Sequence, residues 1–266
     1  MSIHPDARIH PAAIVEDGAT IKAGANIGPF VFVGRDAALG EGVIAKSHCS
    51  ILGWTEIGQE TVIFPFATIG EAPQDLTYRG ERTRLVIGKR NCIREAVTIN
   101  TGTSKGRGIT KVGDDCLFMT GSHVGHDCHV GNGVTMANQA SLGGHSVVED
   151  LAIISGLSGV HQFARVGRSS FVGALTFVSR DVLPYTQVQG SPGKLIGINL
   201  VGLRRRKVSN RDIRSIKEAY DLLVGGGELN FQERVARLEA SGPHCGCVED
   251  ILEFVKKDSK RNYMAP

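Results

Sequence analysis

The sequence predicts a parallel β-helix built from six-residue repeats, followed by a small α-helical domain. Three observations support this prediction: an apolar residue recurs at every sixth position, turn-forming glycine is abundant, and the hydrophobic spacing changes to a helical period towards the C-terminus. Of the 266 residues, 34 are glycine and one is tryptophan. This composition favours a turn-rich solenoid over a helical bundle.

The longest unbroken part of the repeat contains twelve apolar residues at six-residue intervals: Val112, Phe118, Val124, Val130, Met136, Leu142, Val148, Ile154, Val160, Val166, Val172 and Val178. Six residues are too few for a helical repeat but fit one short strand and a corner. If three units form one triangular coil, the chain returns to the same edge every eighteen residues, and coils stack about 4.8 Å apart. The sixth-position residues then fill the interior, and Gly, Asn, Asp and Ser form the corners.

The repeat begins near the N-terminus and is interrupted twice. Its early members, among which Ala45 is the one small residue, are Ile9, Val15, Ile21, Ile27, Val33, Leu39, Ala45, Ile51, Ile57, Ile63 and Ile69. Residues 70–86 and 100–111 abandon the period. The step from Ile99 to Val112 is one residue more than two repeats, so the excess must bulge outward. We expect both interruptions to be loops on a rigid scaffold, where functional residues tend to lie.

The repeat ends near Val178, and turn-forming residues mark a domain boundary beyond it. Pro184 and Pro192 lie in this stretch. We therefore predict a β-helix over residues 1–190 and a helical domain over residues 191–266.

The second domain shows the 3.6-residue period of amphipathic helices. One face of the first predicted helix carries Ile213, Ile216, Tyr220 and Leu223. The glycines at 225–227 predict its end, and two further helices are predicted over residues 231–240 and 248–256. We expect this domain to cap the open end of the coil or to pack on a neighbouring subunit.

Charge and cysteine content exclude several classes of protein. The formal net charge of +3 is too mild to indicate a nucleic-acid-binding protein. The six cysteines have no framework spacing, which favours reduced thiols. The N-terminal residues do not resemble a signal peptide, and no stretch approaches the ~18 apolar residues of a membrane span. We therefore expect a cytoplasmic protein.

Histidines are concentrated where the repeat is most regular. Five of the nine fall within 39 residues: His123, His126, His129, His145 and His161. The eighteen-residue return aligns three neighbouring columns at one edge: His126, Gly144 and Gln162; Asp127, His145 and Phe163; Gly125, Gly143 and His161. The predicted coil therefore gathers imidazoles, a carboxylate and bare backbone within about 10–15 Å.

These residue types suit general-base chemistry. A neutral imidazole such as His126 is a suitable base near pH 7, and Asp127 can fix its tautomer. Gly143 and Gly144 leave backbone N–H groups able to face a developing oxyanion. Because no serine nucleophile accompanies them, the pattern favours direct acyl transfer to a bound hydroxyl.

Other interpretations remain open from the residues alone. The histidines could be corner residues that form hydrogen bonds along a stacked column, in a solenoid that only binds or scaffolds. Cys128 could act as a nucleophile near His126. His123 and His126 with His145 or His161 could also ligate zinc, as in trimeric β-helices of the gamma-class carbonic anhydrases.

The sequence resembles the left-handed β-helix acyltransferases and, more narrowly, the UDP-N-acetylglucosamine O-acyltransferase family, which begins lipid A biosynthesis. The resemblance covers essentially the whole chain. It rests on the segments IGEAPQDLTY (69–78), IREAVTIN (93–100), HVGHDCHVGN (123–132), LGGH (142–145), GVHQF (159–163) and INLVGLRRR (198–206). The hexads are shared by many transferases, whereas the QDL, HxxHD and HQF segments together are specific.

The resemblance implies a homotrimer with active sites between subunits. The donor would be a 3-hydroxyacyl chain on acyl carrier protein, and the acceptor would be the sugar 3-position of UDP-N-acetylglucosamine. Neither a cofactor nor a metal is expected. His126 would be the general base, Asp127 would orient it, and the Gly144 N–H would bind the oxyanion. The residues expected to bind substrates are Gln74, Asp75, His123, His145, His161, Gln162, Asn199 and Arg205.

Three further features bear on specificity. Ala174 occupies the position at which the family gauges acyl-chain length, and its single methyl group predicts a moderately long chain. A basic run over residues 204–207, expected at a helix start, is open to two interpretations: an ordinary solvated helix face, or, with the family in mind, contact of Arg205 with phosphate and attraction of the acidic carrier protein by its neighbours. We favour the second. Departures from the family pattern leave a 3-hydroxyl or a 3-amino acceptor open: Thr77, Asn100, Thr101, Val201 and the segment 191–193.

Overall fold

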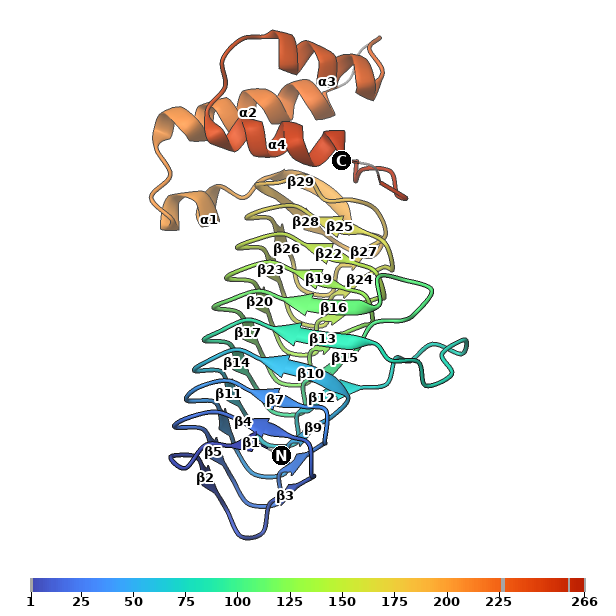
Figure 1. Cartoon of the computed structure of the whole chain (residues 1–266). Coiled ribbons are helices and arrows are strands. Elements are labelled where there is room, and N and C mark those ends of the chain that lie inside the picture. The colour runs from blue at the N-terminus through green and yellow to red at the C-terminus, as the bar shows by residue number, and fades with distance from the viewer. Residues whose placement is uncertain (1, 226–227, 258, 266) are drawn as a thin grey trace.

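A computed structural model describes residues 2–225, 228–257 and 259–265. The chain forms a three-sided parallel β-helix with its N-terminus at one end and a group of helices at the other (Figure 1). Each side of the β-helix is one sheet, and the chain visits the three sheets in turn. This is the coil that the six-residue spacing predicts.

The three sheets are named A, B and C in the order in which the chain enters them. Sheet A contains β1 (Ser2–Ile3), β4 (Thr20–Ile21), β7 (Ala38–Leu39), β10 (Trp54–Ile57), β13 (Arg84–Ile87), β16 (Ile109–Val112), β19 (His129–Val130), β22 (Val147–Val148) and β25 (Arg165–Val166). Sheet B contains β2 (Arg8–Ile9), β5 (Asn26–Ile27), β8 (Ile44–Ala45), β11 (Val62–Ile63), β14 (Cys92–Ile93), β17 (Leu117–Phe118), β20 (Thr135–Met136), β23 (Ile153–Ile154), β26 (Phe171–Val172), β28 (Thr186–Gln189) and β29 (Lys194–Ile198). Sheet C contains β3 (Ile14–Val15), β6 (Phe32–Val33), β9 (Ser50–Ile51), β12 (Thr68–Glu71), β15 (Thr98–Asn100), β18 (His123–Val124), β21 (Ser141–Leu142), β24 (Gly159–Val160) and β27 (Phe177–Val178).

Successive coils pair in parallel with the predicted eighteen-residue offset, as between His123 and Ser141. Three steps depart from it: the last coil, where Phe171 pairs with Gln187 across sixteen residues, and the two interruptions. Trp54 pairs with Arg84 across thirty residues, and Arg84 pairs with Ile109 across twenty-five. The two interruptions therefore insert twelve and seven residues. Because twelve is two full repeats, the first insertion leaves the phase of the sequence unchanged, whereas the second shifts it by one.

The sixth-position residues fill the interior. Phe118 is fully buried, and the small Ala45 is only 1% exposed. Ile3, Ile9 and Val15 of the first coil are only partly buried, because no earlier coil covers them. Burial of apolar area at about 25 cal/mol per Å² therefore stabilises each coil through its neighbours.

Both insertions leave the β-helix at the corner between sheets C and A. They form the loops 72–83 and 101–108, which project from one edge of the coil (Figure 1). The corner segments 125–127, 143–145 and 161–163 follow at the same corner in the next three coils. We call these three segments the histidine ridge. The loops that sequence analysis predicted thus belong to the same edge as the predicted site.

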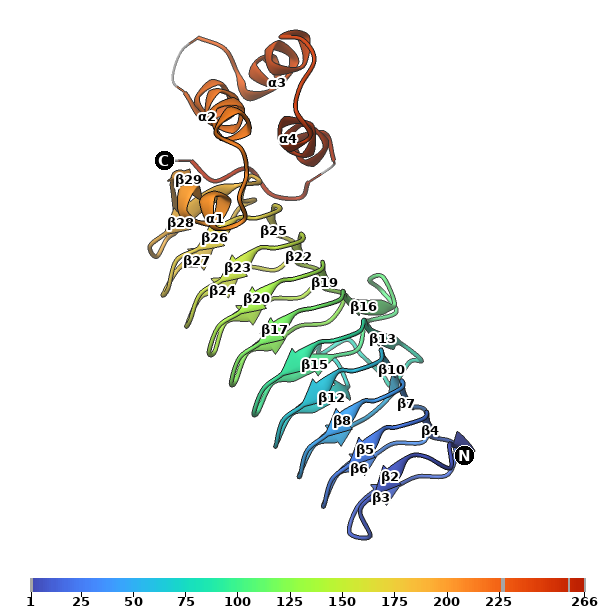
Figure 2. The same cartoon turned by 90° about the vertical axis from the view of Figure 1, so that its left-hand side faces the viewer.

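The C-terminal part of the chain contains α1 (Leu200–Arg205), α2 (Asn210–Val224), α3 (Phe231–Ala240) and α4 (Gly246–Lys256). Helices α2, α3 and α4 lie beyond the last coil, and α1 lies beside sheet B (Figure 2). Gly225 caps α2, whereas residues 226 and 227 lie outside the described part of the chain. Among the described residues, none of the helices is long and apolar enough to cross a bilayer. The domain division at residues 190/191 stays a prediction, and β29 continues sheet B beyond it.

One helical expectation is wrong. The basic run was expected at a helix start, but Arg204 and Arg205 occupy the last turn of α1, and Asn199 caps its N-terminus. Cations are favourable at this end because the helix dipole is negative there. Sequence periodicity missed α1 because six residues are too few to display a helical face.

A buried ion pair fastens the C-terminal segment to the β-helix. Arg165 Nε donates to Asp181 Oδ2 at 2.6 Å, and the Asp181 side chain is fully buried. Nη1 of Arg165 donates to the carbonyl oxygen of Phe254, and its Nη2 donates to the hydroxyl of Tyr263. Ser259 also donates to Asp181. The Arg165 guanidinium therefore joins the last coils to α4 and to the segment that follows it.

We predict that Asp181→Asn lowers the free energy of unfolding by about 3–5 kcal/mol, because it leaves a buried guanidinium without its countercharge. Urea unfolding followed by circular dichroism measures this loss. Asp150→Asn is the matched control: it breaks a half-exposed pair with Arg168, so it should change stability by about 1 kcal/mol or less. Equal losses in the two variants would contradict the fastening role of the buried pair.

Candidate active site

His126 and Gly144 lie against each other on the histidine ridge. A Cβ atom added to Gly144 would lie 2.5 Å from both Cε1 and Nε2 of His126. His145 N, one residue further along, donates to the carbonyl oxygen of His126 at 2.9 Å. Only glycine at position 144 therefore leaves this imidazole in place. The Gly144 N–H has no hydrogen-bond partner among the described residues, and the residue is only partly buried.

The His126 ring is oriented by the next residue in the chain. Its Nδ1 lies 2.9 Å from Oδ2 of Asp127, whose side chain is fully buried, whereas the His126 side chain is 16% exposed. When Nδ1 carries the proton and donates it to the carboxylate, Nε2 is the basic nitrogen. Within the described chain, Nε2 has no hydrogen-bond partner, and it faces the Gly144 backbone.

The Asp127 carboxylate is held by loop 101–108. Oδ2 accepts hydrogen bonds from the backbone N–H of Thr103 at 3.0 Å and from its hydroxyl at 2.6 Å, and Oδ1 accepts from the Arg107 N–H at 2.7 Å. The Arg107 guanidinium also donates to the Asp127 carbonyl oxygen. Burial alone would raise the pKa of Asp127, but hydrogen bonds from Thr103, His126 and Arg107 outweigh it and leave the pKa below its ordinary value.

The same loop packs directly on the ridge through Gly106. A Cβ atom there would lie 2.5 Å from Asp127 Oδ2 and 2.6 Å from His145 Cε1. The sequence did not reveal the roles of Thr103, Gly106 and Arg107. They lie in an insertion, and the eighteen-residue spacing locates only residues that follow the repeat. The available signal was the polar, glycine-rich break in the repeat, which predicted a functional loop but not its contacts.

Two further histidines of the site are biased towards the neutral form. Burial, followed by the positive charge of His126, lowers the pKa of His123, whose Nδ1 lies 2.7 Å from the Thr98 hydroxyl. Burial also lowers the pKa of His145, and the opposing effect of Asp127 is smaller. The His145 ring stacks on Phe163 with centroids 4.5 Å apart. Neutral imidazoles can both donate and accept hydrogen bonds.

The remaining ridge residues face the C-terminal segment or solvent. Nδ1 of His161 lies 2.7 Å from Nη2 of Arg261, and its ring meets Phe177 edge-on. Gln162 is exposed. The predicted column of His126, Gly144 and Gln162 is therefore present, and its last member is free to contact a ligand.

Loop 72–83 places Gln74 and Asp75 on the same side of the molecule. Gln74 is exposed. Asp75 Oδ1 accepts a hydrogen bond from the Thr77 N–H at 2.7 Å, which is the main cause of its lowered pKa. Positive charge on His126 and Lys105 contributes in the same direction. Asp75 is therefore within electrostatic reach of the ridge.

Three predicted residues lie away from the ridge. Ala174 is exposed at the corner between sheets B and C. Asn199 is buried: its side chain accepts from the Gly202 N–H and donates to the Ser169 carbonyl oxygen, so it is engaged as a helix cap. Arg205 lines a cavity of about 380 Å³ between α1 and sheet B. One chain therefore presents two separate groups of predicted site residues.

The chemistry of the ridge weakens two alternatives. The Cys128 thiol is buried, burial raises its pKa to about 12, and its Sγ donates to the Gly143 carbonyl oxygen. Such a thiol is not a nucleophile near neutral pH. His126, Asp127 and His145 have the spacing of a metal site. However, Asp127 Oδ2 already accepts three hydrogen bonds, so a cation at that oxygen would have to displace one of them.

The repeats and the ridge define the class of protein first. A profile described as bacterial transferase hexapeptide (six repeats) matches residues 109–144. A second profile, described as UDP N-acetylglucosamine O-acyltransferase, domain 2, matches residues 181–264. The chain is therefore a hexapeptide-repeat transferase with a specialised C-terminal domain.

Similar proteins then identify the family. A protein of Paracoccus denitrificans named acyl-(acyl-carrier-protein)–UDP-N-acetylglucosamine O-acyltransferase is 50% identical over 205 residues, which cover 77% of each chain. One of the same name from Rhizobium johnstonii is 46% identical over 239 residues, covering 90% of this chain and 87% of that one. The structure of the Francisella novicida UDP-N-acetylglucosamine acyltransferase matches with a TM-score of 0.93 and 36% identity, covering 97% of this chain and 94% of that one. The chain belongs to the UDP-N-acetylglucosamine O-acyltransferase family, and the predicted fold class is confirmed.

Thr103→Val tests whether loop 101–108 stabilises the Asp127 carboxylate. The substitution removes the hydroxyl that donates to Asp127 and keeps the shape of the side chain. Near pH 7 we expect the free energy of unfolding to fall by about 1.5–3 kcal/mol, the contribution of a hydrogen bond to a charged group. The pKa of Asp127 is lower in the folded chain than its ordinary 3.8, so this stabilisation is present above the unfolded pKa and is lost as pH falls through the folded pKa. The difference in free energy of unfolding between variant and wild type should therefore become smaller at acid pH. Urea unfolding at a series of pH values measures this difference.

Thr61→Val is the matched control for this prediction. The Thr61 hydroxyl donates to the Gly88 carbonyl oxygen, so no carboxylate is involved and its effect should not depend on pH. A Thr103→Val deficit that stayed constant down to the acid transition would show that Thr103 does not act on Asp127.

Proposed function

We propose that this protein transfers a (3R)-3-hydroxyacyl chain from acyl carrier protein to the 3-hydroxyl of UDP-N-acetylglucosamine, the first step of lipid A biosynthesis. The observation that carries the proposal is the His126 Nε2, which faces the Gly144 backbone while Nδ1 is held by a buried carboxylate. The relatives named above act on these substrates by name. Neither a 3-amino acceptor nor a zinc-dependent reaction is favoured by those names.

The arrangement supports a direct displacement. His126 Nε2 accepts the proton of the sugar hydroxyl as the oxygen attacks the thioester carbonyl carbon, and the new C–O bond forms. The negative charge on the carbonyl oxygen is stabilised by the Gly144 N–H. Collapse of the intermediate breaks the C–S bond, and His126 returns its proton to the thiolate. Asp127 stays ionised throughout and stabilises the imidazolium, as its lowered pKa allows.

We assign the neutral histidines and loop 72–83 to positioning of the substrates. His123 and His145 flank His126 and can donate hydrogen bonds without adding positive charge. Gln74 and Asp75 approach from the loop, and His161 and Gln162 extend the ridge towards the helical domain.

We further propose a homotrimer of left-handed coils in the cytoplasm, with each site shared by two subunits. Ala174, Asn199 and Arg205 lie on other sides of the coil from His126. Residues on separate sides of one β-helix can meet one ligand when a rotational axis brings two copies together. In such a cleft, Ala174 of one subunit would limit the acyl chain that reacts at His126 of another.

Transfer from 3-hydroxyacyl carrier protein to UDP-N-acetylglucosamine tests the activity. His126→Ala should lower kcat by about 10²–10⁴-fold because the general base is absent, while the circular dichroism spectrum stays unchanged. His129→Ala is the matched control: His129 is exposed on sheet A, and its loss should leave kcat within a factor of about two. Wild-type protein without transferase activity would refute the proposal.

Subunit mixing tests the shared site. If His126 and Arg205 act from different subunits, random trimers of His126→Ala and Arg205→Glu chains should regain about a quarter of the wild-type sites. Light scattering confirms the trimer, and the transferase assay counts the sites. Mixed trimers without any recovery would place both residues in one subunit.

A further inference from the structure

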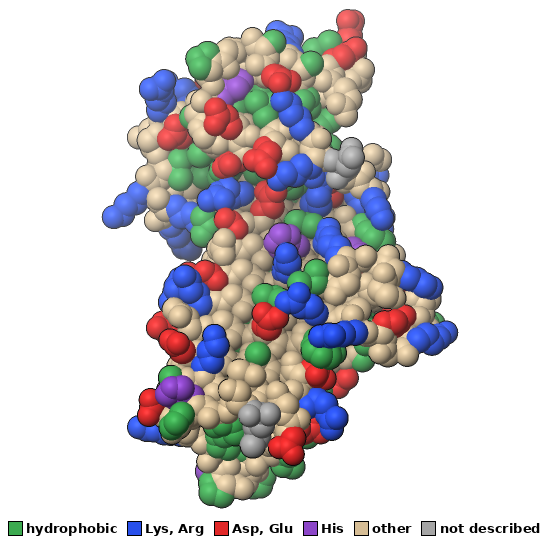
Figure 3. Space-filling view, viewed as in Figure 1, with side chains coloured by type: hydrophobic (Ala, Val, Ile, Leu, Met, Phe, Trp, Pro, Cys, Tyr) green, Lys and Arg blue, Asp and Glu red, His purple; other side chains and the backbone are tan. Residues whose placement is uncertain are grey.

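A second feature of the ridge is a cavity on its sheet A side. The cavity measures about 410 Å³ and is lined by Lys105, Gly106, Arg107, His145, Phe163 and Lys260, among others. It opens below the helical domain and next to loop 101–108, on the face where Lys and Arg side chains gather in Figure 3. Its volume is within the range of small-ligand sites.

Three cations of this cavity lack a carboxylate partner. Among the described residues, Lys105, Arg107 and Lys260 form no ion pair, and none of the residues that line the cavity is acidic. Lys105 forms no ion pair with Asp75, and its positive charge only contributes to the lowered pKa of that carboxyl. Lys260 lies 4.4 Å above the Phe163 ring. Arg165 also lines the cavity, but its charge is neutralised by Asp181.

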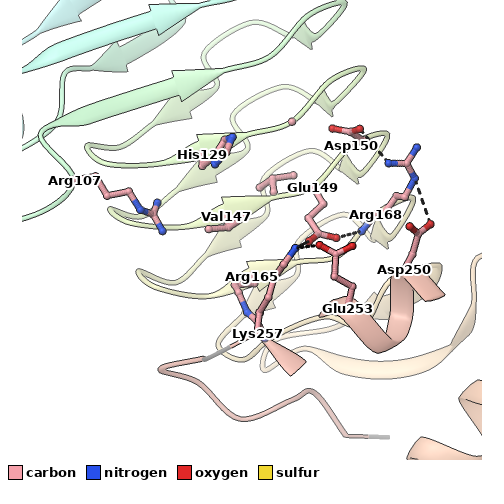
Figure 4. Close-up of a pocket in the computed structure, with 12 residues that line it drawn as sticks. Arg107, His129, Val147, Glu149, Asp150, Arg165, Arg168, Asp250, Glu253 and Lys257 are labelled. Carbon is pink, nitrogen blue, oxygen red and sulfur yellow. Dashed lines mark hydrogen bonds and ion pairs between the residues drawn. The ribbon is translucent and has the colours of Figure 1, made fainter. Parts of the chain in front are cut away.

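The neighbouring cavity shows the opposite arrangement. It measures about 490 Å³ and has four carboxylates in its wall, which the structure pairs with bases (Figure 4). Arg168 contacts Asp150 at 3.1 Å, and Lys257 contacts Glu253 at 2.8 Å. Charges that are paired leave little net attraction for an ion. Arg107 lines both cavities, but Lys105 and Lys260 line only the cavity beside His145, so the larger excess of positive charge lies there.

We propose that the cavity lined by Lys105, Arg107 and Lys260 is a subsite for a phosphate group of one of the two substrates. The proposal rests on the proposed function, because both substrates of that reaction carry phosphate. Lysine ammonium groups and a guanidinium are the usual ligands of phosphate in proteins, and such bonds are strong because both partners are charged. An anion here would be close to three cations, and none of the described residues that line the cavity is acidic.

The subsite is placed to act on the reaction without touching the reacting atoms. His145 forms part of its wall, and the His145 and His126 ring centroids are 5.0 Å apart. Lys105 and Arg107 flank Gly106 in the loop that holds Asp127. A phosphate bound by these cations would therefore tie the substrate to the same loop that orients the base.

Two sources supply this chemistry. One is the phosphodiester of the arm through which a carrier protein presents its thioester, and the other is the diphosphate of the nucleotide sugar. The distinction is kinetic: the first source predicts a changed KM for the carrier-bound donor, and the second predicts a changed KM for the nucleotide sugar. An acyl thioester of pantetheine carries no phosphate on the donor, so with it only the second source predicts a changed KM.

The test compares the double variant Lys105→Gln/Lys260→Gln with a Lys22→Gln control, whose exposed lysine lies in an early coil far from the ridge. At low salt we expect the double variant to raise one KM about 10-fold, with kcat within a factor of about two. With the pantetheine thioester as donor, the KM for the nucleotide sugar should rise if its diphosphate is the ligand and stay unchanged if the carrier arm is. A tenfold change corresponds to about 1.4 kcal/mol. High salt should shrink the difference, because screening weakens exposed charges.

A binding measurement separates this proposal from the activity itself. Titration of the wild-type protein with inorganic phosphate, followed by NMR, should shift resonances of loop 101–108, and the double variant should lose that response. Wild-type protein that binds phosphate there but transfers no acyl group would refute the proposed function alone. Unchanged KM values for both substrates, or phosphate binding retained in the double variant, would overturn the subsite.

Discussion

The hydrogen-bonded register between successive coils is the constraint on which the rest of the structure depends. Outside the two insertions and the last coil, each strand pairs in parallel with the strand eighteen residues later, so a residue's position in the repeat decides which corner it occupies. A shift of one residue would turn every buried side chain outward, and the continuous apolar interior therefore locks the register. His126 and Gly144 meet only because this lock holds over the coils on both sides of them.

The buried carboxylate of Asp127 is the second requirement, and the coil cannot meet it alone. A buried anion is costly unless hydrogen bonds satisfy it. Loop 101–108 supplies those bonds through Thr103 and Arg107, and it can do so because it leaves the β-helix at the corner directly below. The seven inserted residues thus give a repeated corner one oriented imidazole, that of His126.

The same geometry places the predicted site residues on different sides of the chain. The sheet C to A corner carries the histidines, whereas sheet B and its corner with sheet C carry Arg205 and Ala174. A rigid coil has no hinge that could bring these together, so the arrangement favours assembly of several copies. Two adjacent cavities lie on the sheet A side of the ridge. One has mainly paired charges and the other has unpaired cations, so the two cavities differ in electrostatic character.

The sequence by itself determined the parts of the protein that follow from a fixed period: the coil, the interior residues, the column of His126 over Gly144, and the longer helices α2, α3 and α4. Periodicity is a local property, so it can be detected in the sequence alone. Only the tertiary structure decided how the insertions fold back, that Thr103 and Arg107 hold Asp127, that Asn199 caps α1, and that Lys260 approaches Lys105 from the far end of the chain. These contacts join segments outside the repeat, and no spacing in the sequence encodes where two such segments meet.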